Sequence, residues 1–372
     1  MSMTKILIPF INLAEAFKSD SDEIHSMLDE IGTKGHFILG DNVDKFEKEF
    51  SNFIGSAHSI GVANGSDGLF LIMKALGIGP GDEVITQPNS FIASAWTIVA
   101  LGAKPVFCDV DETLGMNPDK LREAITDKTK AVMPVHLTGN PVDLDGIKSV
   151  IEGTSIHLIE DAAQAVGAKY HGVNVGNFGI AAMFSLHPLK NLGVLGDGGV
   201  ITTNDSELDS SIRKLRNHGL IDRDHCEVWG YNSRLDEFQA GIGRIRLRKL
   251  EKNTDRVRKI AEMYTKELTS FVKIPITHHN VKHVYHNYVI HTPKRNELQR
   301  FLLELGIETK VHYPIPIHLQ ECSMSLGYGE GSFPNTEYQS TNSLSLPIYP
   351  ELSDFQVKSV ISAVIDFFKT AP

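Results

Sequence analysis

Two residues with chemically reactive side chains, Lys190 and Asp161, stand where an α/β protein could bring them to one ligand. Asp161 ends the apolar run SIHLIED, which predicts a buried strand, and ligand crevices in open α/β sheets lie beyond the carboxyl ends of strands. Lys190 follows a second predicted strand in FSLHPLKNLGVLGDGG, where glycines let the backbone approach a ligand closely. A lysine amine can form a Schiff base with pyridoxal phosphate, and an aspartate can keep the pyridine nitrogen of that cofactor protonated. A lysine in such a loop is more commonly a surface residue, and an aspartate at a strand end is more commonly a turn residue. The cofactor hypothesis therefore depends on the two residues together.

Two further features agree with a ring that carries a phosphate. The turn Asn64-Gly65-Ser66 lies between a predicted strand and a predicted helix, and a helix N-terminus in this setting binds anions. A plain serine N-cap would explain Ser66 equally well. Phe91 follows the next predicted strand and could stack on the ring, although a phenylalanine there more commonly belongs to the core.

The elements that must position these residues alternate along the chain. Strands are predicted at 57–63, 83–87, 104–110, 130–136, 155–161, 181–186 and 199–203. Helices are predicted at 66–76, 90–101, 118–125, 144–151 and 206–216. Strands separated by helices of about ten residues indicate parallel βαβ units.

The last third of the chain has a different pattern. Apolar residues at helical spacing predict one long helix over 235–268. Beyond Pro275 the pattern is typical of a smaller α+β region, with a strand at 286–292 and helices at 295–305 and 354–369. The Gly/Ser/Pro-rich stretch 323–341 is predicted to be a loop.

Longer motifs carry a family resemblance. In chain order they are VANGSDGL, PNSFIAS, PVHLTGNPVDLD, EDAAQAVGA, FSLHPLKNLGVLGDGGVITT, LRNHG, NSRLDEFQAGIGRIRL and VHYPIPIHLQ. Together they resemble the DegT/DnrJ/EryC1/StrS family of sugar aminotransferases, which use pyridoxal phosphate. The resemblance runs from about residue 10 to the C-terminus.

The resemblance implies an α/β protein of the fold-type I class of pyridoxal-phosphate-dependent transferases. We expect a large, doubly wound, mostly parallel seven-stranded sheet and a small C-terminal α+β domain. Residues 1–253 would form the N-terminal segment and the large cofactor-binding domain, and residues 254–372 the small domain.

The resemblance also implies roles for individual residues. Lys190 matches the lysine that binds the cofactor and moves the proton, and Asp161 matches the partner of the pyridine nitrogen. Gln164 would lie near the ring hydroxyl and Phe91 on the ring face. The positions that would hold the phosphate are Gly65, Ser66, Ser185 and, from the neighbouring subunit, Asn232.

The family therefore implies a homodimer with shared active sites. His312, Tyr313 and His318 lie in the family's subunit-crossing loop and could touch substrate, and a structural role is equally open.

Composition limits the alternatives. The chain has 372 residues, and its net charge of −10 argues against nucleic acid as a partner. No apolar run approaches the roughly 18 residues of a membrane helix, so we expect no membrane association and a cytoplasmic location. The 3 cysteines are widely separated, and the histidines between 278 and 286 lack an evident carboxylate or cysteine partner, so no metal site is expected.

The resulting prediction is an enzyme that moves the amino group of L-glutamate to a keto-sugar, with the cofactor passing through its pyridoxamine phosphate form. The acceptor would be a nucleotide-linked 3- or 4-keto hexose or a 3-deoxy-octulosonate oxidised at C8, in amino-sugar biosynthesis for a surface polysaccharide such as lipopolysaccharide. One alternative is a cofactor-dependent sugar dehydratase, in which relatives carry His in place of the lysine. Another is a non-catalytic regulatory or binding protein on the same fold.

Overall fold

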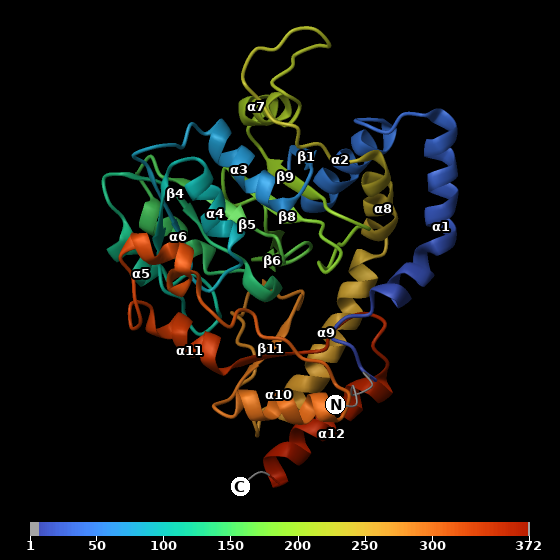
Figure 1. Ribbon diagram of the computed structural model, residues 1–372, viewed down its shortest axis with the longest axis vertical. Helices are drawn as coiled ribbons and strands as arrows, with labels where there is room; N and C mark the ends of the chain where they lie inside the picture. Colours follow the sequence, from blue (N-terminus) through green and yellow to red (C-terminus); the bar gives the residue numbers. More distant parts are fainter. Residues whose placement is uncertain (1–6, 371–372) are drawn as a thin grey trace.

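A mixed seven-stranded sheet forms the centre of the computed structural model, which describes residues 7–370 (Figure 1). The strand order is β1-β9-β8-β5-β4-β2-β3, and only β9 runs antiparallel to its neighbours. The strands are β1 (His58–Val62), β2 (Glu83–Thr86), β3 (Lys104–Phe107), β4 (Thr129–Met133), β5 (His157–Asp161), β8 (Ala181–Ser185) and β9 (Gly199–Thr203). The predicted fold class is confirmed.

Helices cover both faces of this sheet because its central strands are apolar on both sides. Successive side chains of a strand point to opposite faces. In β8, Ala182 and Phe184 join the core with α1 (Leu13–Lys34), α2 (Asp41–Ile54) and α8 (Glu237–Leu247). Ala181 and Met183 join the core on the other face, with α3 (Gly65–Ala75), α4 (Ala93–Ala100) and α7 (Ser206–Arg216).

Helices α5 (Pro118–Ala124) and α6 (Leu144–Ile151) pack beside β2, β4 and β5 in a further apolar cluster. A three-stranded sheet is formed by β10 (Val281–Lys282), β6 (Lys169–Tyr170) and β7 (Val173–Asn174).

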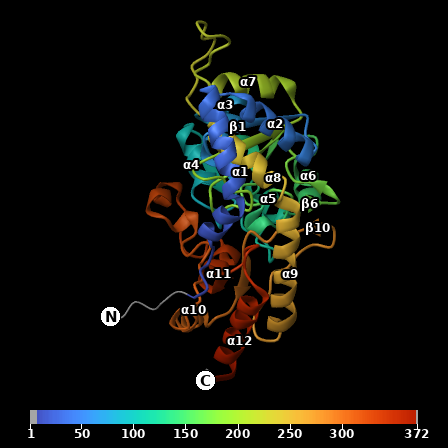
Figure 2. The same cartoon turned by 90° about the vertical axis from the view of Figure 1, so that its right-hand side faces the viewer.

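A second apolar core lies at the other end of α9 (Leu250–Leu268), which Figures 1 and 2 show extending from the large sheet towards α10 and α12. There α9, α10 (Arg295–Glu304) and α12 (Asp354–Thr370) pack with the antiparallel pair β11 (Tyr288–His291) and β12 (Ser343–Leu346). The buried Tyr264 hydroxyl donates to the Pro347 carbonyl. This α+β region agrees with the expected C-terminal pattern, and the division at residue 253 stays a prediction.

The single helix predicted over 235–268 is wrong, because α8 ends at Leu247 and α9 begins at Leu250. Ion pairs from a distant helix hold the residues at the break. The Lys249 amine lies 2.7 Å from the Asp20 carboxylate of α1, and Arg246 lies 3.1 Å from the same carboxylate. Such tertiary contacts leave no mark on the local apolar spacing.

The loop predicted over 323–341 is also wrong in part. A 3₁₀ helix covers Glu321–Leu326, and α11 covers Pro334–Asn342. Pro334 occupies the first turn, where its missing N–H costs nothing. The distant Asp109 carboxylate accepts the N–H groups of Asn335 and Thr336 at 3.1 and 3.0 Å, so it caps a helix whose own sequence resembles a loop.

Within the described residues, no helix is long and apolar enough to cross a membrane.

Candidate active site

Asp161 is a nearly buried carboxylate at the carboxyl end of β5, where the sequence placed it. Ser94, in the first turn of α4, donates a 2.8 Å hydrogen bond to Oδ2, and the Ala163 N–H donates to Oδ1 at 3.2 Å. Burial raises the pKa of Asp161, while these two bonds and the nearby charge of Lys190 oppose the rise. The site therefore favours a further positive charge beside this carboxylate.

The preceding residue, Glu160, fixes the end of the same strand. Its fully buried carboxylate accepts the N–H groups of Gly176, Phe178 and Gly179 at 2.8–3.0 Å. His136 Nδ1 accepts the Val142 N–H, so its Nε2 carries the proton and donates to Glu160 at 3.2 Å. Burial opposes ionisation, yet the hydrogen bonds hold the pKa of Glu160 below its usual value. Glu160 thus anchors the backbone that presents Asp161.

Lys190 lies in the turn after β8, and its N–H bonds the His187 carbonyl at 2.8 Å. Burial lowers the pKa of the Lys190 amine to about 8, and the negative charge of Asp161 acts against this shift. A large fraction of the amine is therefore neutral and nucleophilic slightly above neutral pH. The structure brings together the two residues on which the cofactor hypothesis depends.

The turn before α3 also lies at this site. Its N-cap is Asn64, whose side chain accepts the Asp67 N–H at 2.8 Å, so the serine N-cap considered for Ser66 is wrong. The backbone of Gly65 approaches β8 closely, since a Cβ at Gly65 would lie 3.1 Å from the Cβ of Ser185. The N–H groups of Gly65 and Ser66 have no acceptor within residues 7–370, so they remain available to an anion beside the Ser185 hydroxyl.

The aromatic and amide residues predicted for the ring lie around Tyr313. The Gln164 side chain accepts the Thr138 N–H at 2.6 Å, and its amide donates to the Tyr313 hydroxyl at 3.5 Å. The ring of Phe91 lies 6.0 Å from that of Tyr313 and remains 54% exposed. An exposed aromatic ring is suited to covering a ligand ring.

Two histidines border Lys190. His312 bonds Ser345 Oγ at 2.9 Å, and burial together with the charges of Lys190 and Lys310 lowers its pKa to about 4. His286, which sequence reasoning did not select, lines a pocket with Lys190, and burial lowers its pKa well below the usual value. Both imidazoles are therefore neutral and add no positive charge beside the lysine amine.

The structure does not bring His318 and Asn232 into this group. His318 is buried against Phe333 and bonds Glu337 at 3.1 Å. Asn232 is exposed, and its side chain makes no hydrogen bond within the described chain. Its backbone bridges Asn217, which follows α7 directly. The chain between these two residues projects beyond α7 (Figures 1 and 2). The predicted role of Asn232 would need a second subunit and stays a prediction.

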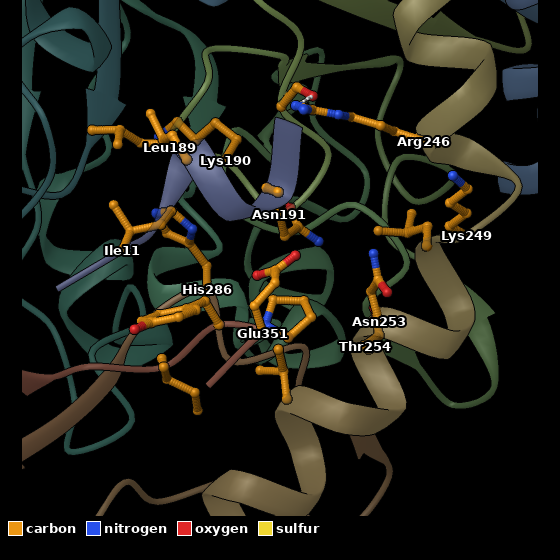
Figure 3. A pocket seen from close by; sticks show the side chains of 18 of the residues that line it. Ile11, Leu189, Lys190, Asn191, Arg246, Lys249, Asn253, Thr254, His286 and Glu351 are labelled. Carbon is orange, nitrogen blue, oxygen red and sulfur yellow. Dashed lines mark hydrogen bonds between the residues drawn. The ribbon is translucent and has the colours of Figure 1, made fainter. Parts of the chain in front are cut away.

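The pocket beside Lys190 opens between the N-terminus of α1, the first turns of α9 and the segment before α12 (Figure 3). Figure 3 shows Lys190 and Asn191 above the side chain of Glu351, with His286 to its left. Within residues 7–370 no cluster of three His, Cys, Asp or Glu side chains is arranged to hold a metal ion.

Comparison with curated proteins gives relatives across nearly the whole chain. The "Pleiotropic regulatory protein" of Geobacillus stearothermophilus is 44% identical over 97% of this chain and 99% of its own. The "dTDP-3-amino-3,4,6-trideoxy-alpha-D-glucose transaminase" of Streptomyces venezuelae is 39% identical over 96% of this chain and 95% of its own. The "UDP-N-acetyl-3-dehydro-alpha-D-glucosamine 3-aminotranferase" of Acidithiobacillus ferrooxidans is 39% identical over 96% of this chain and 97% of its own.

Comparison with solved structures also gives proteins that match nearly the whole chain. DesV of S. venezuelae, in complex with a ketimine intermediate, superposes with a TM-score of 0.96 at 38% identity, covering 99% of this chain and 100% of the other. NtdA of Bacillus subtilis, with bound pyridoxamine phosphate, gives a TM-score of 0.92 at 29% identity, covering 100% of this chain and 86% of the other.

A family model matches residues 18–365. With these relatives and structures it confirms the predicted family, fold and enzyme class. The chain belongs to the DegT/DnrJ/EryC1/StrS aminotransferase family.

Proposed function

We propose that the protein uses pyridoxal phosphate to move the amino group of L-glutamate to a nucleotide-linked 3-keto hexose in amino-sugar biosynthesis. The observation that carries the proposal is the pairing of a lysine amine of lowered pKa, Lys190, with the buried carboxylate of Asp161. A reactive amine next to a buried acid at a strand end is the arrangement that amino-group exchange on a pyridine cofactor needs.

The residues present fit this cofactor. The unpaired N–H groups of Gly65 and Ser66 and the Ser185 hydroxyl form a cradle that a Cβ at position 65 would fill, and a phosphate suits it. Burial raises the pKa of Asp161, so a neighbouring cation would stabilise the ionised carboxylate, and a protonated pyridine nitrogen would supply one. The exposed ring of Phe91 would be available to cover the cofactor ring.

When bound, pyridoxal phosphate supplies a conjugated ring that withdraws electrons from the carbon at which the amino group is exchanged. The chain supplies the rest. The Lys190 amine would accept the proton from the donor's amino-bearing carbon and deliver it to the carbon that carried the cofactor's aldehyde, and its pKa of about 8 suits both transfers close to neutral pH. Asp161 keeps the ring nitrogen charged, and Ser94 holds the carboxylate in place. Gln164, held by the Thr138 N–H, would contact the ring edge, and the buried setting would exclude water from the exchanged proton.

The relatives support the acceptor. The S. venezuelae and A. ferrooxidans proteins are named for hexoses that carry the new amino group at position 3 on a dTDP or UDP carrier. At 39% identity over nearly full length, we assign this chain the same acceptor class rather than a 4-keto hexose or an oxidised octulosonate. We further propose that it acts as a homodimer in which Asn232 reaches the partner's phosphate site.

A non-catalytic regulatory role is the second candidate, because the G. stearothermophilus relative at 44% identity is named a pleiotropic regulatory protein. Retention of both Lys190 and Asp161 favours catalysis. A dehydratase is disfavoured because Lys190 is present rather than histidine.

The test is to incubate the loaded protein with L-glutamate and dTDP- or UDP-linked 3-keto and 4-keto hexoses. We expect 2-oxoglutarate and a nucleotide 3-amino sugar in equal amounts, identified by mass and NMR. Amination of only the 4-keto hexose or the octulosonate would overturn the acceptor assignment. Release of water from the sugar without amination would establish the dehydratase.

A further inference from the structure

The pocket beside Lys190 contains a carboxylate that the proposed reaction does not use. Glu351 lies in the segment before α12, and Figure 3 shows its side chain directed into the pocket. It is only partly exposed and forms no ion pair or side-chain hydrogen bond with another residue of the described chain. Burial and the neighbouring carboxylate of Asp20 raise its pKa, whereas Arg246 acts in the opposite direction. A partly buried carboxylate without a hydrogen-bond partner on another residue favours a ligand that donates hydrogen bonds.

The cations that line the same pocket are already engaged. Arg246 pairs with Asp20 and donates to the Gly193 carbonyl at 2.6 Å. Lys249 lies 2.7 Å from Asp20 and 2.7 Å from Glu23. These pairs fix α1 to α8 and α9, so neither cation neutralises Glu351 directly.

A second acceptor is unsatisfied at the pocket wall. Asn191, next to Lys190, donates through its amide nitrogen to the Val166 carbonyl at 2.7 Å, while its buried Oδ1 has no partner within residues 7–370. The pocket therefore presents an excess of acceptors, the Glu351 carboxylate and the Asn191 carbonyl. Its remaining walls include the apolar side chains of Leu13, Val257 and Ile348.

We propose that this pocket is the subsite for an uncharged, hydroxyl-bearing part of the acceptor sugar, with Glu351 as the specificity-determining residue. Sugar hydroxyls donate to the Glu351 carboxylate and the Asn191 carbonyl, and the apolar wall receives unsubstituted ring carbons. A sugar carboxylate would meet a like charge in a poorly solvated space, so uronates are rejected. The inference rests on the proposed function and narrows its acceptor to neutral keto-hexoses.

The test compares UDP-glucose with UDP-glucuronate, which differ only at C6 and carry no ketone, so binding is read without turnover. Calorimetry is carried out at pH 8, well above the usual pKa of a glutamate side chain. We expect the wild-type holoenzyme to bind UDP-glucose about tenfold or more tightly than UDP-glucuronate, as a hydrogen bond to a charged group is worth about that factor. Glu351→Gln should reduce the preference to within about threefold, because the charge is lost and the shape kept.

The matched control is Glu304→Gln, which removes an exposed carboxylate at the end of α10 and should leave the preference unchanged. Three results would overturn the subsite proposal. The wild-type protein could bind the two nucleotide sugars equally, it could bind neither, or Glu351→Gln could keep the wild-type preference. The glutamate half-reaction of the same preparations is measured in parallel. If the half-reaction is normal but the wild-type protein does not prefer UDP-glucose, only the subsite is rejected. If the wild-type protein lacks the half-reaction, the proposed function is rejected.

Discussion

The hydroxyl of Ser94 donates a 2.8 Å hydrogen bond to Oδ2 of Asp161, which ties the first turn of α4 to the carboxyl end of β5. Ser94 is itself buried and bonds the Ser90 hydroxyl at 2.8 Å. The bond stabilises the ionised carboxylate against the effect of burial, so Ser94 positions the residue that is proposed to hold the cofactor nitrogen.

We therefore predict that Ser94→Ala lowers kcat/KM by about five- to tenfold, equivalent to about 1 kcal/mol. The pKa of Asp161 should rise when the bond is lost, so the acidic limb of the pH–rate profile should move to higher pH. A merely structural defect would change the thermal midpoint and leave the pH limb in place. An unshifted limb would contradict the positioning role.

The pKa of Lys190 gives a pH dependence for cofactor capture. Only the neutral amine attacks the aldehyde of pyridoxal phosphate, and burial lowers the pKa of this amine to about 8. We expect the capture rate of the cofactor-free protein to rise about tenfold per pH unit below 8 and to level off above it. Stopped-flow absorbance measures the rate. Lys190→Ala is the control and should show no absorbance change from cofactor capture. A wild-type capture rate that still rises towards pH 10 would indicate an amine with the pKa of an ordinary exposed lysine.

The charge of Asp161 should matter more than its hydrogen bonds. Asp161→Asn keeps the size of the side chain and removes the anion that favours a protonated pyridine nitrogen. We predict at least about a hundredfold loss in kcat, on the order of 3 kcal/mol, with cofactor still bound. Steady-state kinetics with cofactor occupancy measured on the same sample give the answer. If Asp161→Asn kept the wild-type rate, the proposed electrostatic role of Asp161 would be contradicted.

Asn232 permits a test of shared sites. Asn232 is exposed, its backbone bridges Asn217, and its side chain makes no hydrogen bond within the described chain. If it serves the neighbouring subunit, a closed dimer carries two composite sites. Mixing Lys190→Ala chains with Asn232→Ala chains should then give heterodimers with one intact site and about half the wild-type activity.

Subunit exchange must first be verified by mass spectrometry of tagged chains. If exchange occurs and activity stays at the level of the parents, Asn232 acts within its own chain.

The sequence predicted the strands well because buried parallel strands show as short apolar runs between helices. It predicted Lys190 and Asp161 for a similar reason, since a strand end and a glycine-rich turn are local patterns. The role of Ser94 was not predicted, because a serine in the first turn of a helix is usually a cap. Its contact with Asp161 of β5 is a tertiary contact that the local sequence does not show. The single helix over 235–268 failed because distant Asp20 determines the contacts at its break.

Glu351 illustrates the same limit. Nothing in the local sequence distinguishes it from an exposed helix-preceding carboxylate, and only the packing of α1 and α9 encloses it. Resemblance supplied roles for Gly65, Phe91 and Gln164, and these roles stay predictions. The structure shows only the close approach of Gly65 to β8, the exposed ring of Phe91 and the hydrogen bond of Gln164 to Thr138. For His318, the contacts with Glu337 and Phe333 arise from α11, an element that the sequence pattern did not reveal.

The most direct test of the account is a single half-reaction with nitrogen-15-labelled L-glutamate and the loaded protein, without acceptor. We predict one equivalent of 2-oxoglutarate per site and the label in bound pyridoxamine phosphate, with neither seen for Lys190→Ala although that variant still binds pyridoxamine phosphate. A wild-type protein that binds the cofactor and transfers no label to it, under conditions in which glutamate binds, would contradict catalysis by Lys190 and favour the regulatory role.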